Sequence, residues 1–230
     1  ALIDAVRAGN IEYAQILFDA GSDVDVISYE NGSALVIAAG NGDVASVEFL
    51  LEAPADIAVE ALDGYNAFTA AMHKGHIGCA QILLDANANI DSKENNGFTA
   101  LSSAVYHRKI KSVEFLLGAK ANVNIPNQSG ETALMIAAKI GHITSAQKLL
   151  DAKADVNVVD DDGNTALSLS IAEGHTEFEE MLLEAKADIN AANHNVDGAL
   201  LQAARDGIVA HVQELLNANE IGRASCRERV

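Results

Sequence analysis

The amino-acid sequence predicts an all-α solenoid of stacked helix-turn-helix units with β-hairpin-like loops. A 33-residue period is the first reason, because a leucine recurs seven times at that spacing: Leu17, Leu50, Leu83, Leu116, Leu149, Leu182 and Leu215. The composition is the second reason, since the 230 residues include 41 alanines, ten aromatic residues and no tryptophan. Small side chains suit many thin, closely packed helices better than one aromatic-rich core. A fixed period of this length is typical of repeat architectures.

Residues 129–161 show how one unit is predicted to fold. Gly130 marks a turn, because glycine tolerates the left-handed backbone that a tight turn requires. Thr132 can cap a first helix, whose apolar face continues to the helix stop at Gly141. A second helix of apolar residues at helical spacing follows and ends near Leu150. Two such short helices cannot bury their apolar faces alone, so neighbouring units must stack.

This unit resembles the ankyrin-repeat family through the segments Gly130-Glu-Thr-Ala-Leu-Met-Ile-Ala-Ala, Gly141-His142, Leu149-Leu150 and Ala154-Asp155-Val156-Asn157. The resemblance extends over residues 1–219 and implies about seven units. Their expected bounds are 1–30 (partial), 31–62, 63–95, 96–128, 129–161, 162–196 and 197–219 (partial). It also implies a protein without a cofactor or catalytic activity that recognises other proteins.

Several helix ends depart from the family pattern. The family's helix-ending glycine is present as Gly21, but the equivalent positions hold Pro54, Asn87, Lys120, Lys153 and Lys186. Proline cannot adopt positive φ, so we expect the chain at Pro54 to end its helix differently. Arg108 replaces another glycine, the one matched by Gly75, Gly141 and Gly174, and we expect backbone strain there.

Charge and composition exclude several classes of function. The chain carries 15 basic and 33 acidic residues, a net charge of −18, which argues against binding to nucleic acid or anionic membranes. No apolar run is long enough to span a membrane. Two cysteines cannot build a disulfide framework, which favours a reducing compartment. We therefore expect a cytoplasmic monomer without membrane insertion, with the nucleus as an open alternative.

Neither end of the chain coincides with the end of a repeat. Residues 220–230, EIGRASCRERV, resemble an in-frame translation of a sequencing-library adapter, and we expect an artefactual tail there. The alternative is a genuine basic tail that contacts a partner. Because the chain begins inside a repeat and without Met, we expect it to be a fragment of a longer array or protein.

No catalytic constellation is present in the sequence. His73 and His76 have a spacing that could suit a metal, but no second pair completes four ligands, so we predict no metal site. Cys79 falls on the apolar side of a predicted helix and is expected to be a small buried hydrophobe. The run Asp160-Asp161-Asp162 lacks the ligand spacing of a calcium loop and is expected to be a solvated hairpin tip.

A partner-binding face is predicted where the repeat pattern leaves positions free to vary. These positions directly follow the turn glycine or lie on the first helix. The candidate contact residues are Tyr65, His73, Lys74, Phe98, Tyr106, His107 and Lys139. Aromatic residues dominate interface hot spots, and here they are rare elsewhere in the chain. We expect Tyr65, His73, Phe98 and Tyr106 to gather on one face, with basic residues nearby. The alternative is ordinary surface variation together with internal packing of Phe98.

Asparagine modification is a further hypothesis. Asn124, Asn157 and Asn190 each lie eight residues after a ladder leucine. They match the hairpin asparagine that an oxygen-dependent enzyme can hydroxylate in the ankyrin family. The alternative is that these side chains brace the loop through hydrogen bonds to the backbone.

Three classes of function follow from these observations. The first is a non-catalytic scaffold or adaptor that binds a protein partner on its concave face. The second is a regulatory ankyrin module of a larger enzyme or channel. The third, direct nucleic-acid binding, is disfavoured by the acidic net charge. We therefore expect no enzyme activity from this chain.

Overall fold

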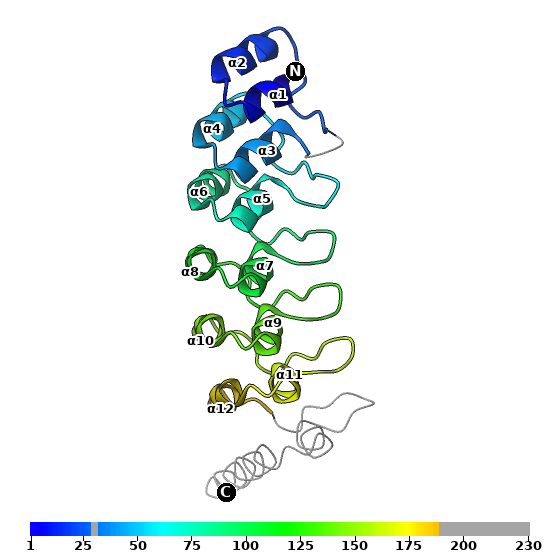
Figure 1. Cartoon of the computed structure of the whole chain (residues 1–230), viewed down its shortest axis with the longest axis vertical. Helices are drawn as coiled ribbons and strands as arrows, with labels where there is room; N and C mark the ends of the chain where they lie inside the picture. Colours follow the sequence, from blue (N-terminus) through cyan, green and yellow to red (C-terminus); the bar gives the residue numbers. More distant parts are fainter. Residues whose placement is uncertain (29–31, 189–230) are drawn as a thin grey trace, which may run out of the picture. The chain divides into compact units, whose positions relative to one another are not determined.

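The computed structural model describes residues 1–28 and 32–188, and these residues form twelve α-helices in six consecutive pairs. Figure 1 shows each pair as two short neighbouring helices, with a projecting loop between one pair and the next. The pairs are α1 (Leu2–Arg7) with α2 (Ile11–Asp19), α3 (Ala34–Asn41) with α4 (Val44–Glu52), α5 (Ala67–Lys74) with α6 (Ile77–Asp85), α7 (Ala100–Tyr106) with α8 (Ile110–Gly118), α9 (Ala133–Lys139) with α10 (Ile143–Asp151), and α11 (Ala166–Ala172) with α12 (Thr176–Glu184). The predicted all-α architecture of stacked helix pairs is confirmed.

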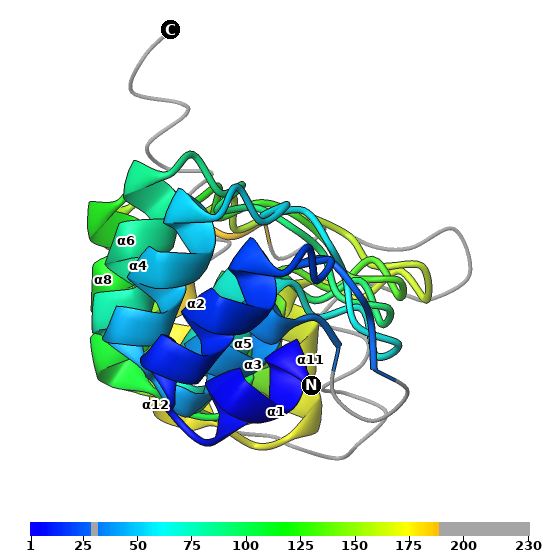
Figure 2. The ribbon, with the colours of Figure 1, turned by 90° about the horizontal axis from the view of Figure 1, so that it is seen from above.

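The chain divides into two compact units, Ala1–Ala121 and Asn122–Val230. In the first unit the first helices pack in order, α1 on α3, α3 on α5 and α5 on α7. Helices α2, α4 and α6 pack in the same order, and Figure 2 shows them on the opposite side of the unit from the loops. In the second unit α9 packs on α11 and α10 packs on α12.

The leucine ladder forms the core of the helix pairs. Leu50, Leu83, Leu116, Leu149 and Leu182 are completely buried, whereas Leu17 in the first pair is half-buried. Alanines are buried beside the ladder, where their small side chains allow the helices to approach closely. Burial of one leucine side chain contributes about 1.5–3 kcal/mol, so the repeated ladder carries much of the stability.

Side-chain caps begin the first helix of each of the later pairs. Thr132 Oγ1 accepts a hydrogen bond from Met135 N–H, which confirms the predicted cap. At Thr99 and Thr165 the bond is reciprocated, because the serine three residues later accepts from the threonine N–H and closes a capping box. A cap of this kind contributes about 1 kcal/mol to helix stability.

The helix ends show the strain expected from the missing glycines. Arg108 has φ of 56°, and Lys120, Lys153 and Lys186 have φ of 68°, 68° and 65°. These residues therefore adopt the left-handed backbone conformation that glycine normally adopts. At Pro54 the helix ends differently, because proline does not adopt positive φ and has no N–H to donate to the Leu51 carbonyl, as Asn87 N–H does to the Leu84 carbonyl at 2.9 Å.

The loops between pairs close as tight hairpins. Glu94 N–H donates to the Phe98 carbonyl at 2.8 Å, and the equivalent bond joins Asn127 to Glu131 at 2.9 Å. Neighbouring hairpins are also bonded to each other within each unit. Asn95 Nδ2 donates to the Leu62 carbonyl at 2.9 Å, and Asp161 N–H donates to the Ser129 carbonyl at 3.1 Å. The predicted β-hairpin-like loops are confirmed.

Some predictions lie outside the described residues. They concern the partial repeat at 197–219, the tail at 220–230 and Asn190. In the ranges that the structure does describe, no helix is long and apolar enough to cross a membrane.

Candidate functional site

In three consecutive repeats the residue after the turn glycine contacts the residue eight positions later. The first member precedes the helix cap and the second lies two turns into the first helix, so both reach the same edge of the repeat. Tyr65 Oη and His73 Nδ1 share a hydrogen bond of 3.2 Å. The rings of Phe98 and Tyr106 meet edge to face, with their centroids 6.0 Å apart.

His107 joins the two aromatic pairs. Its ring lies 5.2 Å from that of His73 and 5.1 Å from that of Tyr106, in both cases nearly perpendicular. Five rings therefore form one continuous row, which we call the aromatic row: Tyr65, His73, His107, Tyr106 and Phe98. Edge-to-face contacts of this kind contribute about 0.5–1.5 kcal/mol each beyond the area that they bury. The structure thus brings together the four aromatic side chains that the sequence analysis placed on one face.

Exposure differs along the aromatic row. Tyr106 is 54% exposed, and His107 is also exposed. Tyr65, His73 and Phe98 are half-buried, and each leaves part of its ring at the surface. The row therefore presents aromatic surface while its packing limits side-chain motion, a combination suited to a binding hot spot.

Basic groups surround the aromatic row. Lys109 Nζ donates a hydrogen bond to the His73 carbonyl, and the exposed Lys74 directly follows His73 on α5. Burial lowers the pKa of His73, and the positive charges of Lys109, His107 and Lys74 lower it further. These effects favour the neutral form of the His73 imidazole.

Glu94 is a component of this site that the sequence analysis missed. Its side chain is only 7% exposed, and burial raises its pKa to about 7 despite hydrogen bonds from Tyr65 and Asn96. Burial and the nearby carboxylates of Glu94 and Asp63 raise the pKa of Tyr65 to about 12. The sequence does mark Glu94 as unusual, because it places a carboxylate at the hairpin position that Ala61 and Asn127 occupy in the neighbouring repeats.

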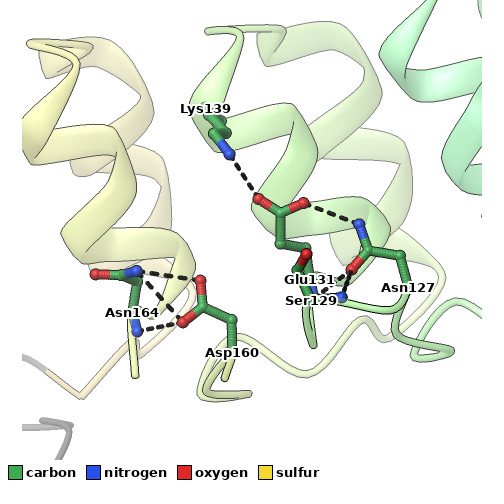
Figure 3. A network of polar contacts seen from close by, with 6 residues as sticks. All are labelled: Asn127, Ser129, Glu131, Lys139, Asp160 and Asn164. Carbon is green, nitrogen blue, oxygen red and sulfur yellow. Dashed lines mark hydrogen bonds and ion pairs between the residues drawn. The ribbon is translucent and has the colours of Figure 1, made fainter. Parts of the chain in front are cut away.

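The second unit fills the same positions with an ion pair. Lys139 Nζ lies 2.7 Å from Glu131 Oε1, and Asn127 Nδ2 donates to Glu131 Oε2 at 2.8 Å (Figure 3). Burial raises the pKa of Glu131, but the bonds from Lys139 and Asn127 outweigh it, so the pKa is lowered overall. The next repeat has Asn164, which bonds to Asp160 (Figure 3). Lys139 is thus exposed but already paired.

The other candidate residues have structural partners. The His73 imidazole belongs to the aromatic row. His76 is the N-cap residue of α6, and its ring packs so closely against Gly42 that a Cβ there would lie 2.5 Å from His76 Nδ1. The equivalent His175 donates from Nδ1 to the Ala138 carbonyl of the preceding repeat at 2.9 Å. No group of three potential metal ligands occurs among the residues described. Cys79 is fully buried, as predicted, and burial raises the pKa of its thiol.

The hairpin asparagines connect successive repeats. Asn124 Oδ1 accepts from Asp155 N–H at 2.9 Å, and Asn157 Oδ1 accepts from Asp188 N–H at 2.8 Å. Asp25 makes the equivalent bond to Asp56 N–H. Both asparagines are exposed, and their side chains brace the loop as the alternative hypothesis expected. Hydroxylation of either residue stays a prediction.

Comparison with known proteins identifies the repeat. A family profile described as ankyrin repeats in three copies matches residues 35–127 and 119–193. A second profile, ankyrin repeats in many copies, matches residues 2–51. Only ankyrin repeats, a non-catalytic type of domain, are found in this way. A search of curated proteins finds no match. The chain belongs to the ankyrin-repeat family.

Proposed function

We propose that this chain is a non-catalytic scaffold or adaptor that binds a protein partner through the aromatic row. The observation that supports this most strongly is the row itself: five of the few rings in the chain are joined on one edge of two adjacent repeats. Tyrosine at the centre of such a surface typically contributes 2 kcal/mol or more to binding.

The charge around the row indicates the kind of partner. Lys74 and Lys109 lie close to it in a chain whose overall charge is −18. The buried Glu94 carboxyl has a pKa of about 7, so it is only partly ionised at neutral pH. The local surface is therefore more positive than the rest of the molecule, which favours a partner segment that carries carboxylates.

Tyr106 is the residue at which this function is best tested. It is 54% exposed, so its removal changes the surface more than the core. Tyr65 is less suitable, because its half-buried hydroxyl is bonded to His73 and contacts Glu94. Tyr13 on α2 is 49% exposed and provides a matched control of the same chemistry away from the aromatic row.

The experiment is a selection of random peptides displayed on phage. Peptides selected on the unaltered chain should lose at least tenfold in affinity for Tyr106→Ala and less than twofold for Tyr13→Ala. Both variants should keep the thermal midpoint within a few degrees. Equal binding by Tyr106→Ala, or failure to select any peptide, would refute the proposed function. Lys139→Ala belongs in the same series, with a smaller expected effect because its ammonium is already paired with Glu131.

A further inference from the structure

A cavity interrupts the surface beside the aromatic row. Arg7, Gly40, His73 and Tyr106 occupy equivalent positions on successive first helices, 33 residues apart. Gly40 alone among them has no side chain, and a cavity of about 380 Å³ opens at this position in the first unit. That volume lies within the range of pockets that bind small ligands or side chains.

The cavity combines apolar walls with charged groups. Val36 and Ile37 of α3 line one part, and the rings of Tyr65 and His73 line another, so the cavity adjoins the aromatic row. An apolar side chain that binds there would be removed from water by contact with these apolar walls.

Two cations also line the cavity. Lys74 is exposed and forms no ion pair within residues 1–28 and 32–188. Arg7 lies 3.6 Å from Asp4, an exposed pair that costs little to rearrange. Asp63, an acidic residue that also lines the cavity, accepts a hydrogen bond from Tyr65 N–H at 3.3 Å. Among the described residues that line the cavity, the two cations thus outnumber the single carboxylate, which complements a negatively charged occupant.

We propose that the Gly40 cavity receives an apolar side chain from an acidic peptide segment of the partner, whose flanking carboxylates meet Lys74 and Arg7. This inference rests on the proposed function and adds to it a defined anchor point. It also separates two roles on one surface: the aromatic row supplies contact area, and the cavity selects an apolar residue with acidic neighbours.

Gly40 itself provides a variant that fills the cavity without disturbing the fold. A Cβ at this position would have one neighbour within 4 Å, Ala70 Cβ at 3.8 Å, which is an ordinary contact. Gly40 lies inside α3 and has no positive φ, so replacement also favours the helix. Gly40→Leu should occupy the cavity, while Gly40→Ala, the matched control, leaves most of it open.

The probe is the peptide acetyl-Gly-Glu-Leu-Glu-Gly-amide, titrated into the 15N-labelled full chain and followed by NMR. We expect saturable shifts of the amides of Gly40 and its neighbours, and at least fivefold weaker binding when glutamine replaces both glutamates. Gly40→Leu should weaken binding at least tenfold without lowering the thermal midpoint, and Gly40→Ala should change it less than twofold. Lys74→Gln should reduce the preference for glutamate.

Unchanged binding to Gly40→Leu, or absence of shifts at the cavity, would overturn this inference. The phage-selected peptides then separate it from the proposed function. If those peptides depend on Tyr106 but tolerate Gly40→Leu, the cavity has no role while the binding function stands. If they are indifferent to Tyr106, the proposed function itself fails.

Discussion

The two compact units place different chemistry on the same framework. In residues 1–121 the paired positions hold Tyr65 with His73 and Phe98 with Tyr106, whereas in the second unit they hold Glu131 with Lys139. Both units nevertheless share the buried leucines and helix caps. The shared positions therefore set the stability of the fold, and we propose that the variable pairs set recognition. An ion pair with an exposed lysine contributes little, whereas partly exposed rings are typical of binding surfaces.

The largest expected effect on stability comes from exchanging glycine and arginine at equivalent helix ends of the two units. Arg108 and Gly141 both have positive φ, but a Cβ at Gly141 would lie only 2.7 Å from His175 Nε2. We expect Gly141→Arg to lower the free energy of unfolding by about 2–3 kcal/mol, because it adds a steric clash to backbone strain. Urea denaturation measures this, with Arg108→Gly as the control, which should stabilise by about 0.5–1 kcal/mol. If both variants changed the free energy of unfolding by a similar amount in the same direction, the explanation by strain and steric clash would be contradicted.

Glu94 distinguishes the first unit by its response to pH. Its pKa rises from about 4.5 in the unfolded chain to about 7 in the folded protein. The folded state therefore favours the protonated carboxyl, and the contribution of Glu94 to stability is fully present below pH 4.5 and is lost as the pH rises to about 7. Glu94→Gln should remove this loss and stabilise the protein at pH 8 by about 1–2 kcal/mol, allowing for solvent screening.

The test compares the free energy of unfolding of the variant and the unaltered chain from pH 5 to 8. The difference between them cancels the opposite contribution of His73, whose lowered pKa costs stability as the pH falls below its unfolded value. Glu48→Gln, at an exposed position, is the control and should change nothing. A difference that is constant with pH would show that Glu94 is not held in its protonated form.

Double-mutant cycles test the contrast between rings and ions directly. The coupling between Phe98 and Tyr106 should be about 0.5–1.5 kcal/mol and insensitive to salt. The coupling between Glu131 and Lys139 should be about 0.2–1 kcal/mol and should fall markedly in about 1 M NaCl. The same salt dependence for both pairs would remove the distinction between the units.

The smallest expected effect concerns the loop brace. Asp25, Asn124 and Asn157 each accept a hydrogen bond from the next hairpin, but the equivalent Ala58 has no side-chain oxygen. Ala58→Asn should add this bond and raise the free energy of unfolding by about 0.5 kcal/mol. Asn157→Ala should have the opposite effect. Thermal denaturation of both variants measures the two changes in stability. Destabilisation by Ala58→Asn would show that the hairpin at Ala58 cannot accommodate the brace.

Much of the fold could be predicted from the sequence because its determinants repeat. The leucine period located the core, and Thr132 and Gly141 located the start and stop of a helix. The gathering of the aromatic residues also followed from their equivalent positions. The positive φ of Lys153 could not be predicted with the same certainty. The local preference of lysine is against this backbone conformation, and tertiary packing outweighs that preference.

Two features of the site could not be predicted, because they depend on single exceptions to the repeat. Glu94 is buried and forms a hydrogen bond with Tyr65, a contact that no spacing rule contains. The cavity arises where Gly40 leaves a gap between side chains from three successive repeats. Sequence patterns describe what the repeats share, whereas this site is built from what they do not share.

The affinity of one phage-selected peptide for two variants at equivalent positions tests the central claim most directly. Calorimetric titration would compare the unaltered chain with Tyr106→Ala in the first unit and Lys139→Ala in the second. If the aromatic row is the binding surface, Tyr106→Ala raises Kd at least tenfold while Lys139→Ala changes it less than threefold. Equal losses, or a larger loss for Lys139→Ala, would contradict the assignment of recognition to the first unit.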